Sequence, residues 1–186
     1  MKRVFDFSFS IFLILFTFIP FLVISLLVIV TSGFPVLFWS ERIGKDNESF
    51  FMPKLRTMKN NSPQLATHLM EDANNFYTPL GKFLRQSSLD EIPQLFSVLK
   101  GKMSFVGPRP ALFNQDDLIK LRIENRVHTL IPGVTGWAQV NGRDELTIEQ
   151  KVGYETEYLE LKSFNFDLYI IWLTIKKVLS KDGVSH

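Results

Sequence analysis

The stretch Phe7 to Val30, FSFSIFLILFTFIPFLVISLLVIV, decides the organisation of this chain. It contains no charged residue, and none occurs between Asp6 and Glu41. A helix over this stretch would be about 36 Å long at about 1.5 Å per residue, enough to cross a hydrocarbon core of about 30 Å. The run is too long for the core of a cleaved signal peptide. We therefore predict a membrane-inserted segment over residues 1–39 and a folded domain over residues 40–186.

The path of this segment through the membrane is left open by the residues alone. Pro20 lies in the middle of the run, where it removes a backbone hydrogen bond and is expected to kink or break the helix. Basic residues lie on both flanks, Lys2 and Arg3 before the run and Arg42 and Lys45 after it, and such residues favour the cytoplasmic side. A re-entrant hairpin places both flanks there. A plain spanning helix fits the residues equally well, because proline is tolerated in membrane helices.

The composition favours a membrane surface over nucleic acid as the partner. Lys and Arg number 21 against 19 Asp and Glu, and a net charge of +2 is too small to predict nucleic-acid binding. The chain has no cysteine, which excludes disulfides and zinc–thiolate sites. It also lacks a P-loop and a glycine-rich dinucleotide motif, so any phosphate binding would have to use side chains.

Short apolar stretches punctuated by Gly and Pro predict a mixed α/β, mainly helical domain beyond residue 40. A helix is predicted over residues 114–127, and loop or short strand over residues 131–143. Residues 165–179 mix apolar and aromatic side chains with two lysines. That pattern predicts an amphipathic helix that either lies at the membrane interface or packs on the domain core.

Two adjacent acids, Asp90 and Glu91, are the first candidates for chemistry. Ser88-Leu89-Asp90-Glu91 fits a capping box, which predicts a helix from about Leu89 to Lys100. Carboxylates at a helix N-terminus stay ionised and can act as nucleophiles, although acids in a first turn are also ordinary capping residues. Downstream, two prolines fix the backbone around Arg109 in Gly107-Pro108-Arg109-Pro110, and the planar guanidinium suits phosphate oxygens. Cations at Lys54, Arg56, Lys82 and Arg85 precede the acids, as a diphosphate substrate would require.

Several long stretches resemble one family, the bacterial sugar transferases, and in particular its small monotopic phosphoglycosyl transferases. Besides the apolar segment with its central Pro20, the matching stretches are KLRTM (54–58), RQSSLDEIPQL (85–95), LKGKMSFVGPRP (99–110) and PGVTGWAQVNGR (132–143). Several extended matches in one order are far more specific than one short motif. One departure is Ile19, where the family often has serine before the proline.

The resemblance implies a ping-pong reaction at a catalytic pair, Asp90 and Glu91. The Asp90 carboxylate would attack the β-phosphorus of a UDP-sugar and expel UMP, and polyprenyl (undecaprenyl) phosphate would then take the sugar phosphate from the aspartate. Glu91, with Asp90, would hold Mg²⁺. The residues that would bind substrate are Arg56, Arg85 and Arg109, with Glu155 as a further candidate for holding an arginine or the substrate.

The resemblance also implies where the protein works and which step it performs. We expect a re-entrant helix and interfacial amphipathic helices that place the site at the cytoplasmic face of the inner membrane, where the first membrane step of glycan synthesis occurs. An N-acetylated amino sugar is the expected donor group, and other glycan-pathway enzymes are candidate partners. Two alternatives remain: a catalytically silent membrane scaffold, and a transferase with one spanning helix that uses UDP-glucose or UDP-galactose.

Overall fold

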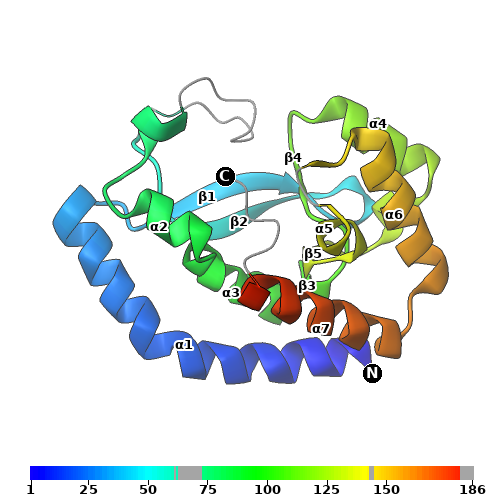
Figure 1. The fold of residues 1–186 in the computed structure, drawn as a ribbon, viewed down its shortest axis with the longest axis horizontal. Coiled ribbons are helices and arrows are strands. Elements are labelled where there is room, and N and C mark those ends of the chain that lie inside the picture. Colours follow the sequence, from blue (N-terminus) through cyan, green and yellow to red (C-terminus); the bar gives the residue numbers. More distant parts are fainter. Residues whose placement is uncertain (61, 63–72, 143–144, 181–186) are drawn as a thin grey trace.

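The computed structural model describes residues 1–60, 62, 73–142 and 145–180. Within them the fold is mostly helical α/β, with one long N-terminal helix beneath a compact mixed domain (Figure 1). The α-helices are α1 (Lys2–Ser32), α2 (Gly81–Gln86), α3 (Leu95–Leu99), α4 (Asp116–Glu124), α5 (Trp137–Val140), α6 (Ile148–Leu161) and α7 (Phe164–Ser180). The strands are β1 (Leu37–Ile43), β2 (Ser49–Leu55), β3 (Ser104–Val106), β4 (Ala111–Leu112) and β5 (Gly133–Thr135). Short 3-10 turns are η1 (Lys45–Asn47), η3 (Ala73–Phe76), η4 (Leu89–Gln94) and η5 (Val127–Thr129).

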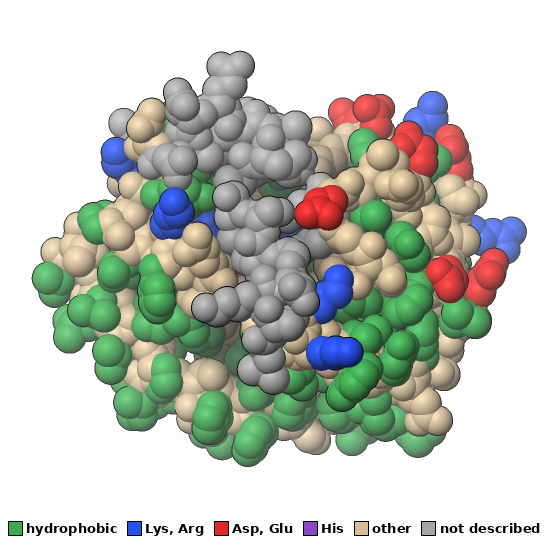
Figure 2. Space-filling model, in the orientation of Figure 1, with side chains coloured by type: hydrophobic (Ala, Val, Ile, Leu, Met, Phe, Trp, Pro, Cys, Tyr) green, Lys and Arg blue, Asp and Glu red, His purple; other side chains and the backbone are tan. Residues whose placement is uncertain are grey.

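Helix α1 is continuous through its proline and is long and apolar enough to cross a membrane. It has 31 residues with Pro20 inside, and Figure 1 shows that it changes direction part way along the domain. Only 6% of its most apolar window is buried, unlike the core helix of a soluble protein. Hydrophobic side chains gather along this edge of the molecule, over α1 and α7 (Figure 2). A membrane is the solvent that would cover this surface.

Charged side chains tie the beginning of α1 to the domain. The Lys2 ammonium donates to the Asp167 carboxylate at 2.6 Å and to the Val106 carbonyl at 3.0 Å. The Arg3 guanidinium donates to the carbonyls at the end of α3, those of residues 98 and 99, both at 2.7 Å. The buried Asp6 carboxylate accepts the backbone N–H of Phe105 at 3.2 Å. The first turns of α1 are therefore part of the folded domain.

The end of α1 is tied to the same domain by one arginine. The Arg56 guanidinium donates to three successive carbonyls just where the helix ends, those of Ser32 at 2.5 Å, Gly33 at 2.6 Å and Phe34 at 2.9 Å. These are carbonyls that a helix end leaves without intrahelical partners, and a cation is favoured beside them. Arg56 directly follows β2, so the sheet holds the end of α1.

Two small sheets organise the domain. The first has the strand order β2-β1-β4 and is antiparallel, with Phe38 opposite Lys54 and Ser40 opposite Met52. The second pairs β3 with β5 in parallel, so the chain leaves both strands at the same edge. Buried residues Phe50, Met52, Val98, Met103, Phe105, Val106, Val140, Tyr158 and Ile170 form one core cluster, against which Phe5 and Phe9 of α1 pack.

The predicted helix from Leu89 to Lys100 is found in a different form. Residues 89–94 form the 3-10 turn η4, and α3 follows directly. The predicted capping box is wrong, because Ser88 adopts a left-handed conformation with φ of 56° and its side chain makes no capping hydrogen bond. The first turn is closed instead by the i→i+3 bond from the Glu91 N–H to the Ser88 carbonyl at 3.1 Å.

The remaining secondary-structure predictions are largely confirmed. Helix α4 lies inside residues 114–127, and α7 covers residues 165–179. Within 131–143 the structure has the short strand β5 but also one turn of helix, α5, that was not predicted; Arg143 lies outside the described residues. The predicted boundary between residues 39 and 40 falls inside β1.

We predict that Arg56→Gln destabilises the protein by about 2–4 kcal/mol, because three carbonyls at the end of α1 lose a charged donor. Thermal unfolding in detergent should show a midpoint lowered by several degrees. The matched control is Lys102→Gln, which removes an exposed ion pair with Glu48 and should change stability by about 0–1 kcal/mol. Equal midpoints for Arg56→Gln and the natural chain would contradict the anchoring role.

Candidate active site

Strand β2 and turn η4 pack together and bring one lysine against the acid pair. Lys54 lies on the face of β2 that also carries the buried Phe50 and Met52, since side chains alternate along a strand. Its ammonium is 2.9 Å from a Glu91 carboxylate oxygen and 3.9 Å from one of Asp90. Residues far apart in the sequence thus form one buried charged cluster.

Glu91 is held firmly by two cations. Its Oε1 accepts from the Lys54 ammonium at 2.9 Å and from Arg109 Nη2 at 3.1 Å. Burial alone would raise the pKa of Glu91, but the Lys54 and Arg109 charges outweigh it and lower that pKa well below its usual range. Glu91 is therefore a fixed carboxylate anion, and its Oε2 makes no hydrogen bond to the described part of the chain.

Asp90 is placed differently, although it is the next residue. It is only 5% exposed, and its carboxylate makes an ion pair with Lys54 but accepts no hydrogen bond from the residues that the structure describes. Burial raises the pKa of Asp90, Lys54 lowers it and the neighbouring Glu91 raises it further, with a net upward shift. A carboxylate that is desolvated and not fixed by hydrogen bonds keeps its lone pairs available for attack.

Burial also lowers the pKa values of cations beside these acids. The pKa of Lys54 is lowered by burial and by Arg109, against the opposite effect of Glu91 and Asp90. Burial and the nearby Arg109 charge also lower the pKa of Arg42 to about 10. The cluster thus holds several positive groups around two largely buried acids, an arrangement that suits a polyanionic ligand.

The backbone around Arg109 is fixed by partners from several elements. Gly133 N–H donates to the Pro108 carbonyl at 2.9 Å, and Arg42 Nη1 donates to the Pro110 carbonyl at 3.2 Å. Just before this segment, a β-carbon at Gly107 would lie 2.2 Å from the Ile131 carbonyl oxygen, so only glycine fits there. The loop that follows β3 therefore presents the Arg109 guanidinium to Glu91 from a rigid base.

The other predicted substrate-binding residues lie in different surroundings. Arg85 donates to the Thr57 hydroxyl at 2.9 Å and lies over the Tyr77 ring, near enough to Asp90 for its charge to lower that residue's pKa. Arg56 donates to carbonyls at the end of α1, as described above. Glu155 is 2% exposed and pairs with Arg122 rather than with the acid cluster. The substrate roles of these three residues stay predictions.

Three residues of this region were not predicted as site residues. Lys54 was one of the cations expected to serve a diphosphate substrate, but no local pattern shows that it contacts Glu91. Arg42 was read only as a flanking charge, and Arg122 only as part of a helix. Their roles depend on pairings between distant segments, which a single sequence does not display.

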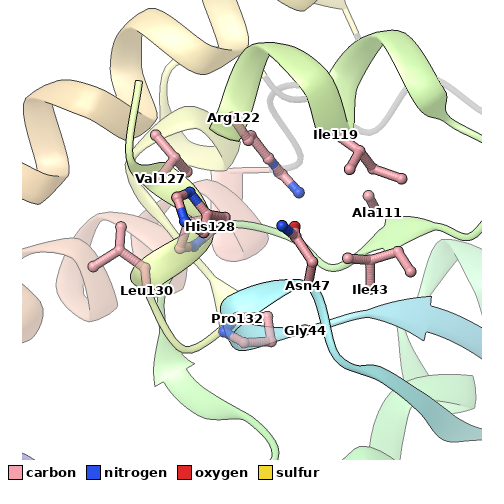
Figure 3. A pocket seen from close by; sticks show the side chains of 11 residues that line it. Ile43, Gly44, Asn47, Ala111, Ile119, Arg122, Val127, His128, Leu130 and Pro132 are labelled. Carbon is pink, nitrogen blue, oxygen red and sulfur yellow. The ribbon is translucent and has the colours of Figure 1, made fainter. Parts of the chain in front are cut away.

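A cavity of about 20 Å³ is lined by side chains from β1, η1, β4, α4 and η5 (Figure 3). It is lined by Ile43, Gly44, Asn47, Pro108, Ala111, Ile119, Arg122, Val127, His128, Leu130 and Pro132. Such a volume holds about one water molecule, so it cannot be the binding site of a nucleotide-sized ligand.

The chain is similar to proteins of one enzyme family over nearly its whole length. The family model described as "Bacterial sugar transferase" matches residues 1–181. A Bacillus subtilis (strain 168) protein, "Uncharacterized sugar transferase EpsL", is 38% identical over 188 residues, which cover 100% of this chain and 91% of that protein.

Two longer relatives carry names that state a reaction. The Escherichia coli (strain K12) "UDP-glucose:undecaprenyl-phosphate glucose-1-phosphate transferase" is 38% identical over 163 residues, 83% of this chain and 35% of the relative. An Aeromonas hydrophila "UDP-N-acetylgalactosamine-undecaprenyl-phosphate N-acetylgalactosaminephosphotransferase" is 34% identical over 164 residues, 86% and 39% of the two chains. The chain thus spans less than half the length of these two relatives.

We predict opposite effects on stability when the two acids are neutralised. Because the pKa of Asp90 is raised in the folded protein, the Asp90 charge destabilises the fold. This destabilisation is complete above the folded pKa and disappears below the unfolded pKa of about 3.9. Asp90→Asn should therefore raise the thermal midpoint at pH 7, and this gain should vanish toward pH 4.

The charge of Glu91 has the opposite effect on the stability of the fold. Because the pKa of Glu91 is lowered in the folded protein, the Glu91 charge stabilises the fold. This stabilisation is complete above the unfolded pKa of about 4.3 and is lost as the pH falls through the folded pKa. Glu91→Gln should lower the midpoint at pH 7, because Lys54 and Arg109 lose their common partner. Melting curves of both variants from pH 4 to pH 8 measure this, and equal shifts for the two acids would refute the assignment.

Proposed function

We propose that this chain, which belongs to the bacterial sugar transferase family, transfers a sugar 1-phosphate from a UDP-sugar to polyprenyl phosphate. The observation that carries the proposal is the contrast between the two acids: Asp90 is buried without hydrogen bonds from the described residues, while Glu91 is fixed by Lys54 and Arg109. A nucleophile beside a cationic cluster is what attack on a diphosphate requires. The reactions named for the two longer relatives support the same substrate classes.

The reaction proceeds by two successive transfers of the sugar phosphate, first to Asp90 and then to polyprenyl phosphate. A carboxylate oxygen of Asp90 forms a bond to the β-phosphorus, and the bond from that phosphorus to the bridging oxygen breaks, so UMP leaves with the electron pair. An oxygen of polyprenyl phosphate then attacks the same phosphorus and releases the Asp90 carboxylate. The product is a polyprenyl diphosphate sugar, and Lys54 and Arg109 stabilise the charge that develops on the phosphoryl oxygens.

The acid pair also fits the donor set of Mg²⁺. Magnesium is commonly bound through one or two carboxylates together with substrate phosphates and water. The Asp90 carboxylate and Glu91 Oε2 accept no hydrogen bond from the described residues, and these atoms would hold the ion. Among the same residues there is no group of three or more His, Cys, Asp or Glu placed for metal binding, so the substrate phosphates would complete the set. When bound, Mg²⁺ neutralises charge on the diphosphate.

The sugar is proposed to be an N-acetylated amino sugar, with glucose or galactose as the competing donor groups. The Aeromonas hydrophila relative is named for N-acetylgalactosamine, whereas the Escherichia coli relative is named for glucose and one from Salmonella typhimurium for galactose. Identities of 33–38% to all three do not separate the two classes of donor. The donor panel below decides between them.

The membrane helix is proposed to be re-entrant, so that the protein sits at the cytoplasmic face of the inner membrane. Lys2 and Arg3 at one end of α1 and Arg56 at the other hold the same domain. A helix that crossed the bilayer would separate these two anchors by about 30 Å of hydrocarbon, which the polar domain cannot follow. The bend in α1 (Figure 1) is what a helix needs to enter and leave on one side.

Helix α7 supports the same placement. Its exposed side chains include Leu168, Tyr169, Trp172, Ile175 and Val178, and the Lys176 ammonium lies over the Trp172 ring at 5.6 Å. Aromatic and apolar side chains beside lysine suit the level of the lipid headgroups. The phosphate of a lipid-linked acceptor lies at that level, so we propose that the site works there.

The first test is magnesium-dependent UMP release from a panel of UDP-sugars, with and without polyprenyl phosphate. We expect one class of donor to release UMP with the natural chain, and at least a 1,000-fold lower rate with Asp90→Asn, because loss of a covalent nucleophile typically costs this much or more. The matched control is Asp117→Asn, an acid in the first turn of α4, which should leave the rate unchanged. A folded natural chain that releases no UMP from any donor would favour the scaffold alternative.

The re-entrant path predicts that both ends of α1 face the cytoplasm. Because the chain has no cysteine, single cysteines can be placed before Met1 and at Lys45. In intact cells, a membrane-impermeant thiol reagent should label neither, and both should react after the cells are opened. Efficient labelling of the N-terminal cysteine alone in intact cells would show a spanning helix.

A further inference from the structure

Arg122 and Glu155 form a doubly bonded ion pair in the interior of the domain. Arg122 comes from the last turn of α4 and is 7% exposed, and Glu155 comes from the middle of α6 and is 2% exposed. Nε of the arginine donates to Oε2 of the glutamate at 2.8 Å, and Nη2 donates to Oε1 at 2.5 Å. Burying such a pair is costly and often adds little net stability, so stability alone does not account for it.

The same guanidinium reaches the segment that carries Arg109. Arg122 Nη2 also donates to the Arg109 backbone carbonyl at 2.9 Å. Arg109 in turn donates from its own Nη2 to Glu91 at 3.1 Å. Arg109 therefore links the buried pair to the acid cluster. The pair holds the backbone from which the Arg109 side chain extends.

The two neighbouring backbone carbonyls are held by other donors. The Pro108 carbonyl accepts from the Gly133 N–H at 2.9 Å, and the Pro110 carbonyl accepts from Arg42 Nη1 at 3.2 Å. Figure 3 shows the Arg122 guanidinium reaching from α4 into the small cavity, toward Asn47. A shorter side chain at 122 would enlarge this cavity and admit water, which can solvate the carbonyl but does not fix its direction.

We infer that Arg122 and Glu155 are positioning residues for the transfer reaction. Glu155 fixes the plane of the Arg122 guanidinium, and Arg122 fixes the peptide that follows Arg109. The Arg109 guanidinium is thereby held in a single orientation toward Glu91 and the substrate phosphates. This inference rests on the proposed function, and it assigns a role to two residues that touch neither the substrate nor the acid pair.

The test is a double-mutant cycle between Arg122→Lys and Arg109→Lys. Lysine keeps a cation that can pair with Glu155, but it lacks the planar fork that bonds Glu155 and a carbonyl at once. Using the UDP-sugar that the donor panel identifies, we expect Arg122→Lys to lower kcat for UMP release by about 10–100-fold with a smaller change in KM. In the Arg109→Lys background the same change should cost about 2-fold or less, because the residue it acts through is already altered.

Val152→Ala is the matched control for a purely structural effect. Val152 is 2% exposed, lies one turn before Glu155 on α6 and belongs to a different apolar cluster with Leu118 and Val127. It should lower the thermal midpoint while kcat stays within about 2-fold of the natural value at temperatures where the protein is folded. Glu155→Gln should lower kcat in the same direction as Arg122→Lys.

Hydrogen exchange of peptides covering residues 104–112 gives a readout that needs no activity. Exchange there should become faster in Arg122→Lys and stay unchanged in Val152→Ala. Losses that add fully in the double mutant would overturn the inference. If the natural chain releases no UMP from any donor, the proposed function fails, and unchanged exchange in Arg122→Lys then overturns the positioning role as well.

Discussion

The attachment of α1 at both ends to one folded domain is the constraint on which the rest of the structure depends. A long apolar helix that is exposed along most of its length is unstable in water and has to be covered. Charged residues at its beginning and Arg56 at its end prevent it from moving independently of the domain. The environment that covers α1 therefore also sets the position of the acid cluster. Arg56, which holds the end of α1, directly follows the strand β2 that carries Lys54.

The acid cluster shows how neighbouring residues of one type can be given different properties. Asp90 and Glu91 are adjacent, yet the pKa of one is raised and that of the other lowered. Burial disfavours the charge on both acids, and the cations compensate for it unequally. Glu91 receives two charged hydrogen bonds, whereas the Asp90 carboxylate, among the described residues, is paired through the longer contact with Lys54. Separating the pKa values of two acids is a common way to separate their chemical roles.

Local patterns predicted much of the fold and part of the candidate site. The apolar run, the helix that contains Leu118 and the C-terminal helix are visible because their periodicity or composition is strong. The capping box failed because Ser88 is left-handed, and sequence does not reveal such a conformation. The pairings of Lys54 with Glu91 and of Arg122 with Glu155 were not predicted, because the partners lie 37 and 33 residues away. Arg56 was assigned to substrate, whereas its contacts in the structure are with the end of α1 and with Asn60.

The ion pair between Lys2 and Asp167 joins residues that are 165 positions apart, nearly the whole chain. A ribosome delivers the N-terminal segment first, so α1 is made long before α7. The Lys2 ammonium lacks two of its partners until α6 supplies the Tyr158 hydroxyl and α7 supplies the Asp167 carboxylate. The contacts by which Lys2 joins the Val106 carbonyl to Asp167 are therefore complete only after α7 has been made.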